Sequence, residues 1–304
     1  MYTYNSCGLA IASAFALPGL VACENASAAP DVRIALGHVD AQLPDAQAQG
    51  PTWQSAPGRM LLSIPAIARI LIAGGQNVTC DLQHPDALLH LPVFLRSSVL
   101  GILLRQRKSA VLRASAVELD GKAILFCGAS GTGKSTLAAV LAQRGMHVIA
   151  DDLCAVEARA GNPLIHPDNG RVQLWQQAVT ALDLQAMQAM PVRPCLEKFH
   201  MDFAAAPRDT PWPLGAVYVL RKPPAGQTEV IVSASPIEAM RLLWASSWFA
   251  DADSSDEARD FQVLTAIARK GLVFQLLWPD SFDHLAGAIA TLVAHAREHV
   301  SVAS

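Results

Sequence analysis

The stretch Gly128-Ala129-Ser130-Gly131-Thr132-Gly133-Lys134-Ser135 decides how the rest of this sequence is interpreted. It fits the phosphate-loop pattern G-x-x-x-x-G-K-[ST] in full. In such a loop the glycines let the main chain approach a phosphate, and successive N–H groups bind the anion together with the start of the next helix. The lysine reaches the β- and γ-phosphates, and the serine hydroxyl helps to hold Mg²⁺.

The segments on either side of this loop match what a phosphate site needs. An apolar run at 123–126 precedes it, and a helical pattern follows from Lys134 to about Arg144, where Gly145 ends the helix. A simple glycine-rich turn before an ordinary helix would leave Lys134 without a reason. We therefore predict that the nucleotide is bound by Gly128, Ala129, Ser130, Gly131, Thr132, Gly133, Lys134, Ser135 and Thr136.

Two adjacent carboxylates, Asp151 and Asp152, follow the next apolar run at 147–150. Phosphoryl transfer needs one carboxylate near the metal and often another that orients or deprotonates the acceptor. Neighbouring residues at the end of a strand point to different sides and can divide these tasks. An exposed Asp-Asp turn is the competing interpretation, and the phosphate loop one helix upstream favours a functional pair.

Composition narrows the class of protein. The chain has 304 residues, of which 52% are hydrophobic and 16% charged, so it can bury a sizeable core. Its formal net charge of −3 gives no basic field for nucleic acid or an anionic membrane, and we expect neither as a partner. The six cysteines are scattered without a C-x-x-C pair, which predicts buried, reduced thiols in a cytoplasmic enzyme.

The N-terminal segment 8–23 is strongly apolar, and Ala26-Ser27-Ala28 mimics a signal-peptidase site. However, no Lys or Arg precedes Arg33, and Pro18 interrupts the run. A secretory signal needs a positive start, and a membrane span needs a longer run. We therefore predict a buried strand or hairpin here.

The pattern along the chain divides at about residue 109. Residues 1–108 contain apolar runs at 8–17, 32–36, 59–64 and 77–82, a predicted short helix at 65–73 and a longer one at 92–106. From residue 109, strands are predicted at 111–119, 123–126, 147–150, 214–220, 228–232 and 272–277, and helices at 236–249, 261–270 and 281–299. The sequence predicts a smaller α+β domain over 1–108 and an α/β domain over 109–304.

Several of these segments resemble the C-terminal domain of HPr kinase/phosphorylase. They are Ala114-Ser115-Ala116-Val117, the phosphate loop and the stretch 144–152. The sequence resembles even more closely the HPr kinase-like proteins that are found with lasso-peptide biosynthesis. The segments that carry this resemblance are 8–13, Leu17-Pro18, Leu174-Trp175, 193–198 and 214–220. The resemblance implies an α/β P-loop kinase domain of the HPr kinase (PEP carboxykinase-like) type, preceded by the smaller domain.

The resemblance also implies an ATP- and Mg²⁺-dependent serine kinase that acts on a peptide or protein, plausibly a lasso-peptide precursor. By this analogy Asp152 is the general base, Asp151 and Ser135 contact the metal, and Lys134 contacts the phosphates. The alternatives are an HPr-type protein or a small molecule as acceptor, or a nucleotide-binding module without catalysis. The sequence leaves oligomeric state open, with a homo-oligomer as one possibility.

Two positions depart from the family pattern. The family carries His before Ala-Ser-Ala-Val, where this sequence has Arg113, which can stabilise transferred charge but cannot shuttle a proton. We assign Arg113 to the γ-phosphate. The family also carries an acidic residue after the Asp-Asp strand, and residues 171–175 contain none.

Four side chains and one loop have weaker functional interpretations. Lys198 and Arg193 are equally well explained as phosphate or peptide contacts and as solvated cations. His295 and His299 are one helical turn apart but lack a third metal ligand. The acidic segment 251–256 is a candidate surface for a basic leader peptide.

Overall fold

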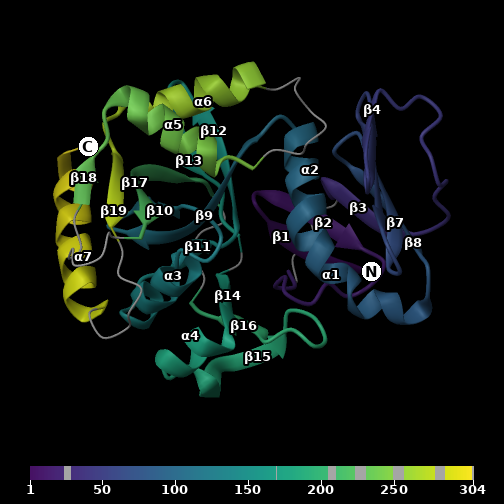
Figure 1. Ribbon diagram of the computed structural model, residues 1–304, viewed down its shortest axis with the longest axis horizontal. Coiled ribbons are helices and arrows are strands. Elements are labelled where there is room, and N and C mark those ends of the chain that lie inside the picture. The colour runs from purple at the N-terminus through teal and green to yellow at the C-terminus, as the bar shows by residue number, and fades with distance from the viewer. Residues whose placement is uncertain are drawn as a thin grey trace.

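A computed structural model describes residues 1–23, 29–168, 170–204, 210–222, 231–248, 257–277 and 285–302. In these residues the chain forms two large sheets and one small sheet, with helices against them (Figure 1). It is a mixed α/β protein.

The first sheet is built entirely from the N-terminal part of the chain. Its eight strands lie in the order β1-β2-β3-β8-β7-β6-β5-β4. Their bounds are Tyr2–Ser6, Leu9–Ser13, Val32–Leu36, Ala48–Gly50, Trp53–Ala56, Arg59–Ile64, Ala68–Ala73 and Asn77–Leu82 for β1 to β8. β2, which lies in the apolar segment 8–23, is buried and pairs with β1 as an antiparallel hairpin, so the buried strand predicted for this segment is confirmed.

The short helix predicted at 65–73 is wrong, because this segment forms strand β7. Ala68, Ile70 and Ile72 are buried, while the residues between them are partly exposed. This period of two belongs to a strand with one face on the core, and β-branched isoleucine favours it. Gly74-Gly75 does not end a helix but turns the chain from β7 into β8, with both residues at positive φ.

A helical segment follows the first sheet, as predicted for 92–106. A short 3₁₀ helix, η1 (Pro85–Leu89), leads into α1 (Leu91–Phe94), a single π turn, η2 (Leu95–Val99), and α2 (Leu100–Gln106). Their apolar side chains share a core with the first sheet. That core also includes Val111, Leu153, Ala155 and Trp248, so it extends beyond residue 108.

The second sheet carries the phosphate loop. Its strands follow the order β10-β9-β12-β13-β17-β19-β18, with β11 paired to β9 and β10 also paired to β17. The bounds are Ala110–Leu119, Lys122–Cys127, Val148–Ala150, Leu153–Arg159 and Asn162–Ile165 for β9 to β13, and Trp212–Arg221, Ile231–Ser233 and Val273–Leu277 for β17 to β19. Helices α3 (Lys134–Gln143) and α7 (Leu285–Val302) share one core with this sheet, and α5 (Pro236–Ser246) and α6 (Glu257–Arg269) share another. The sheet therefore lies between two helical layers.

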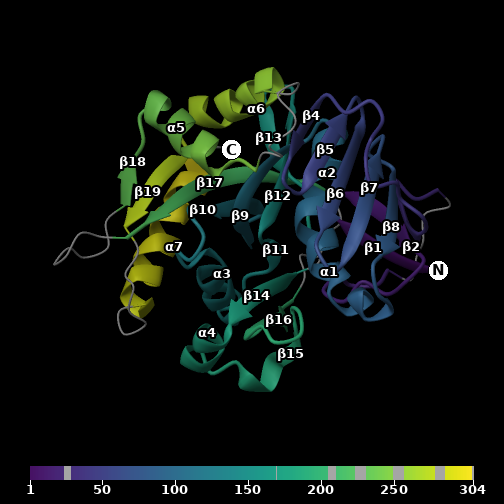
Figure 2. The same cartoon turned by 45° about the vertical axis from the view of Figure 1, so that its right-hand side comes forward.

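A third, small sheet was not predicted. Its strands lie in the order β14-β16-β15, with bounds Arg171–Trp175, Gln188–Pro191 and Lys198–Asp202 for β14, β15 and β16. It is joined by α4 (Gln176–Ala181) and η3 (Gln185–Met187). Figure 2 shows this sheet below the second one, next to α3. Val172, Leu174 and Met201 pack against Ala139 of α3.

The strands predicted at 111–119, 123–126, 147–150, 214–220 and 272–277 are confirmed as β9, β10, β11, β17 and β19. The helices predicted at 236–249 and 261–270 correspond to α5 and α6, and the strand at 228–232 is described from residue 231. The helix predicted at 281–299 is described from residue 285, and the acidic segment 251–256 lies outside the described residues.

All six cysteines are free, but the prediction that all are buried is wrong for two of them. Cys195 is exposed and Cys23 is half-buried, because both lie in irregular segments at the protein surface. Within the described residues, no helix combines the length and apolar character that a membrane crossing requires.

Candidate phosphate loop and carboxylate site

The predicted phosphate loop connects β10 to α3 and turns sharply. Gly128, Gly131 and Gly133 have φ values of 137°, 81° and 92°, which favour glycine. A Cβ added at Gly128 would lie 2.9 Å from the main-chain oxygen of Leu220. Since that oxygen belongs to β17 and cannot easily move, only glycine fits at this position. Thr136 lies in the first turn of α3, whose N-terminus faces the loop.

Lys134 folds back over the loop that it terminates. Its Nζ donates hydrogen bonds to the main-chain oxygens of Gly128 and Ala129, at 2.9 and 2.8 Å. Burial lowers the pKa of Lys134, against an opposing effect of the Asp151 and Asp152 charges. The ammonium group therefore lies within the electrostatic reach of both carboxylates.

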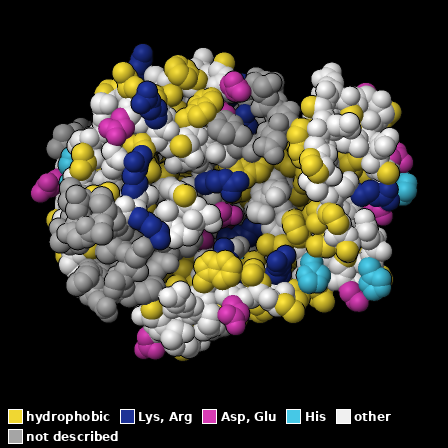
Figure 3. Space-filling view, in the orientation of Figure 1, with side chains coloured by type: hydrophobic (Ala, Val, Ile, Leu, Met, Phe, Trp, Pro, Cys, Tyr) yellow, Lys and Arg dark blue, Asp and Glu magenta, His cyan; other side chains and the backbone are white. Residues whose placement is uncertain are grey.

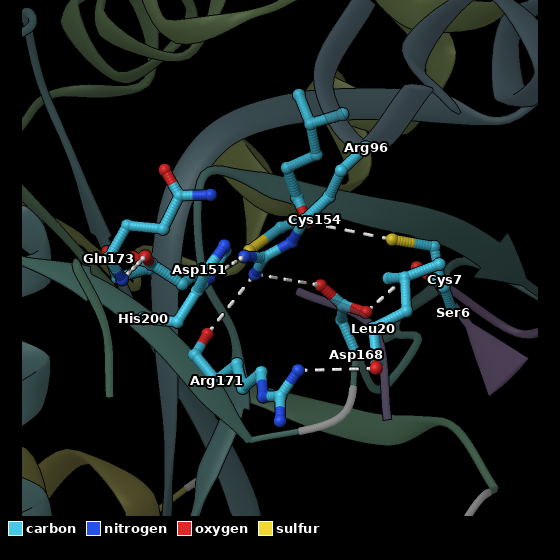
Figure 4. Close-up of polar contacts among 12 residues, drawn as sticks. Ser6, Cys7, Leu20, Arg96, Asp151, Cys154, Asp168, Arg171, Gln173 and His200 are labelled. Atoms are coloured by element: carbon cyan, nitrogen blue, oxygen red, sulfur yellow. Dashed lines mark hydrogen bonds and ion pairs between the residues drawn. The ribbon is translucent and has the colours of Figure 1, made fainter. Parts of the chain in front are cut away.

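Asp151 is buried at the end of β11 and is held by three donors. Its Oδ1 accepts hydrogen bonds from the hydroxyls of Ser135, at 2.8 Å, and Ser115, at 2.6 Å. Its Oδ2 accepts one from the main-chain N–H of Gln173, at 3.0 Å, as Figure 4 shows. These donors come from α3, β9 and β14. The carboxylate is thus fixed directly beside the phosphate loop.

Asp152 differs from Asp151 in its exposure and in its backbone conformation. It is exposed, and its φ of 77° places it in the left-handed region, which aspartate tolerates better than most residues. The chain turns sharply between β11 and β12 at this point, so the two side chains lie in different environments. One carboxylate is anchored inside, and the other is open to a molecule that approaches from solvent.

Arg113 lies on β9 and is exposed, although its neighbours Leu112 and Ala114 are buried. Its Cα is paired with Leu153, directly after the two aspartates. The Arg113 charge contributes to the lowered pKa of Lys134. Figure 3 shows a hollow in the middle of one face, close to where β9, β11 and α3 meet in Figure 1, with basic and acidic side chains beside each other. The structure therefore brings the phosphate loop, both aspartates and Arg113 together.

Sequence analysis missed two of the three groups that bind Asp151. Ser115 is fully buried between Ala114 and Ala116 in β9, and a hydroxyl between two small apolar residues was the signal that the sequence offered. Gln173 contributes its main chain, which leaves no trace in the sequence. A buried carboxylate, Asp168, also lies close enough for the Asp151 and Asp152 charges to act on it.

The weaker candidates do not converge on the site in the same way. His295 and His299 stack on each other with ring centroids 4.2 Å apart, and His295 contacts the hydroxyl of Tyr218 at 2.8 Å. They belong to the packing of α7 on the second sheet. Lys198 lies over the ring of exposed Trp175 at 5.8 Å, and Arg193 is exposed.

The donor set fits Mg²⁺ rather than a softer metal. Mg²⁺ prefers oxygen ligands, takes one or two carboxylates from protein and completes its shell with phosphates and water. The Asp151 carboxylate and the Ser135 hydroxyl provide such oxygens beside the loop. Among the described residues, no group of three or more His, Cys, Asp or Glu side chains forms an alternative metal site.

Comparisons with known proteins do not assign this chain to a family. No family model and no curated protein matches the sequence. Among solved structures, the chain is similar to the HPr(Ser) kinase/phosphatase from Coxiella burnetii, with 15% sequence identity and a TM-score of 0.33 over 62% of this chain and 95% of that one. A TM-score this low assigns neither a fold family nor a function, so the site has to be judged on its own residues.

Proposed function

We propose that this protein is an ATP-dependent phosphotransferase that phosphorylates a serine hydroxyl of a peptide or protein. One observation carries the proposal. The serine of the phosphate loop, Ser135, donates to the buried carboxylate of Asp151, while the next residue, Asp152, is exposed. This arrangement supports one carboxylate for the metal side of the reaction and one for the acceptor.

The residues would divide the reaction as follows. The N–H groups of 128–135 and the Lys134 ammonium bind the triphosphate. Ser135 and Asp151 would hold Mg²⁺, which neutralises phosphate charge when bound. Asp152 accepts the proton of the acceptor hydroxyl, whose oxygen bonds to the γ-phosphorus as the bond to the β–γ bridging oxygen breaks. The products are a phosphate ester and ADP.

Arg113 fits the same scheme as a fixed positive charge near the γ-phosphate. A guanidinium can bind two oxygens of a transferring phosphoryl group at once, and it does not lose its proton. Its exposure on β9 beside Lys134 leaves it able to reach that group. It cannot replace the family histidine in a proton transfer, so we do not assign it the reverse reaction.

The acceptor is proposed from the family resemblance, which favours a peptide and, within that class, a lasso-peptide precursor. An HPr-type protein and a small molecule are the other acceptors to be tested. The arginine at position 113 also favours one different function, a nucleotide-binding module that does not transfer phosphate.

Substitution of Lys134 tests the site. Labelled ATP is incubated with the protein and serine-containing acceptors, and transfer is compared for wild type, Lys134→Ala and the control Lys270→Ala. Lys270 is exposed after α6, where it donates to Asn162. We expect Lys134→Ala to lower transfer by about 100-fold or more, since a charged donor to the phosphates is lost, and the control to retain it.

Undiminished transfer by Lys134→Ala would rule out this site. Asp152→Asn separates the two functions, because it should bind ATP like wild type in calorimetry but transfer phosphate slowly. If the wild-type protein binds ATP but transfers phosphate to none of the acceptors, a nucleotide-binding module without catalysis is the better description.

A further inference from the structure

Two main-chain segments outside the phosphate loop support Asp151 and the strand that precedes it. The first is β14, whose Gln173 N–H donates to the carboxylate. The second is residue Asp168, whose N–H donates to the main-chain oxygen of Ile149 in β11, at 2.6 Å. The position of the carboxylate therefore depends on both segments.

The N-terminal part of the chain contacts both of these segments. The Ser6 hydroxyl donates to Asp168 Oδ1 at 2.8 Å, and the two residues also form an isolated antiparallel bridge. The Arg171 guanidinium, at the start of β14, donates to the main-chain oxygen of Leu20 at 3.2 Å. Residues from β1 and from the loop after β2 thus lie directly against the supports of Asp151.

Arg96 is the side chain that connects these contacts. It lies in the π turn η2, and its side chain is only 7% exposed. One terminal nitrogen donates to the main-chain oxygen of Arg171 at 3.3 Å and lies 3.8 Å from Asp168 Oδ2. The other lies 3.3 Å from Nδ1 of His200, in β16 (Figure 4). Single π turns within α-helices often occur at functional sites.

The Arg96 charge affects the pKa values of both His200 and Asp168. Arginine has no acceptor, so Nδ1 of His200 accepts the hydrogen bond and the ring is neutral. Burial first, and the Arg96 charge second, lower the pKa of His200 to about 3. Burial raises the pKa of Asp168, and the Arg96 charge opposes this effect. Arg96 is therefore a buried cation that lies beside the Asp168 carboxylate and also contacts the start of β14.

We propose that Arg96 is a positioning residue for Asp151, which it holds through strand β14 and the segment around Asp168. Its catalytic consequence rests on the proposed function, whereas its effect on the geometry does not. A planar guanidinium suits the task, because its fixed fork contacts a carbonyl, a carboxylate and a ring nitrogen at once. The site on the second sheet would then be complete only when the N-terminal part is in place.

Arg96→Met tests the proposal, because it keeps an unbranched apolar stem in the same place and removes the charge and the donors of the guanidinium. The matched control is Arg69→Met in β7, where the ion pair with Asp81, at 2.8 Å, lies in the first sheet but contacts neither support. Three quantities are measured: hydrogen exchange of the Gln173 amide by NMR, Mn²⁺ binding to the complex with a non-hydrolysable ATP analogue by EPR, and kcat and KM for ATP.

For Arg96→Met we expect about tenfold faster exchange at Gln173, about tenfold weaker Mn²⁺ binding and a kcat about tenfold lower, the range typical of groups that orient a metal ligand. KM for ATP should stay near wild type, since the phosphate loop is untouched. Arg69→Met should change none of these. Unchanged Gln173 exchange and Mn²⁺ binding in Arg96→Met would overturn the proposal.

A double variant distinguishes positioning from simple burial of a charge. Arg96→Met leaves Asp168 buried without its cation, and adding Asp168→Asn removes that charge. We expect the double variant to recover thermal stability but not Gln173 protection or Mn²⁺ binding. Recovery of all three would overturn the proposal. If wild-type protein transfers no phosphate, the proposed function fails, but amide exchange and Mn²⁺ binding still decide the role of Arg96.

Discussion

Asp151 shows how single hydrogen bonds shape the candidate site. A buried carboxylate is costly unless donors satisfy its oxygens. Ser135 is expected to turn toward a bound cation, and Gln173 contributes through its main chain. Among the residues that the structure describes, the hydroxyl of Ser115 is therefore the one side-chain donor that holds the carboxylate both with and without a bound cation.

Ser115→Ala is expected to weaken both stability and transfer. Loss of a hydrogen bond to a charged group costs about 1.5–3 kcal/mol in the free energy of unfolding. Transfer should fall by about 10- to 100-fold, with a higher Mg²⁺ requirement, because the metal-side carboxylate is less well oriented. Urea unfolding and Mg²⁺ titrations of the rate measure the two effects.

Ser13→Ala is the control for this prediction. Ser13 is also fully buried in a strand, and its hydroxyl accepts from the Phe15 N–H at 3.3 Å. The control should lose stability but keep the wild-type Mg²⁺ requirement. If Ser115→Ala behaves in the same way, Ser115 has no role in orienting Asp151.

The residues that sequence analysis found and missed differ in one physical respect. The phosphate loop and the two aspartates are runs of adjacent residues, so their chemistry is visible in a local pattern. Ser115 and Gln173 meet Asp151 across 36 and 22 residues of chain, and Arg96 meets His200 across 104. Such contacts depend on tertiary packing, which the pattern of one sequence does not reveal.

At the level of elements, the same difference separates correct from wrong predictions. The long strands β9 and β17 are predominantly apolar and mostly buried, so their runs stand out in the sequence even though β9 also carries Arg113, Ser115 and Glu118. The third sheet was missed because β14, β15 and β16 are short and mix polar or charged residues with apolar ones. The segment of β7 was misassigned because Gly74-Gly75 ends a helix as readily as it turns a hairpin.

The loop after β2 makes a close contact that can be tested. Gly19 has a φ of 98°, and an added Cβ would lie 2.6 Å from Cε1 of His200 in β16. Gly58 has a φ of 67°, but an added Cβ there would meet nothing within 4 Å. Alanine at either position would have to adopt a positive φ, which costs free energy. Only at position 19 would it also clash with a neighbouring side chain.

We expect Gly58→Ala to lower the free energy of unfolding by about 1–2 kcal/mol, the cost of the left-handed conformation. Gly19→Ala should cost about 1–3 kcal/mol more, because it also forces His200 out of a packed site. Urea unfolding gives both values. Equal losses in the two variants would show that the loop does not press on β16 as the structure has it.

For the whole molecule, the question is whether residues 1–108 and 109–304 are independent domains, as the sequence predicts. The first core includes Val111, Leu153, Ala155 and Trp248 from the second part. The ring of Trp248 lies against α2, where a Cβ added at Gly101 would be 2.7 Å away. The buried side chains of Arg105, in α2, and Asp260, in α6, form an ion pair between the two parts.

These contacts predict that the chain unfolds as one cooperative unit. Separated from residues 1–108, the fragment 109–304 would expose apolar surface around Leu153 and Trp248 and leave Asp260 buried without its arginine. Removing one partner of a buried ion pair costs about 3–5 kcal/mol, and exposed apolar patches promote aggregation. Full-length protein should give a single calorimetric transition, and the fragment should be insoluble unless it is co-expressed with residues 1–108. A soluble fragment that unfolds cooperatively and binds ATP would instead establish the second part as an independent domain, with no need for the N-terminal sheet.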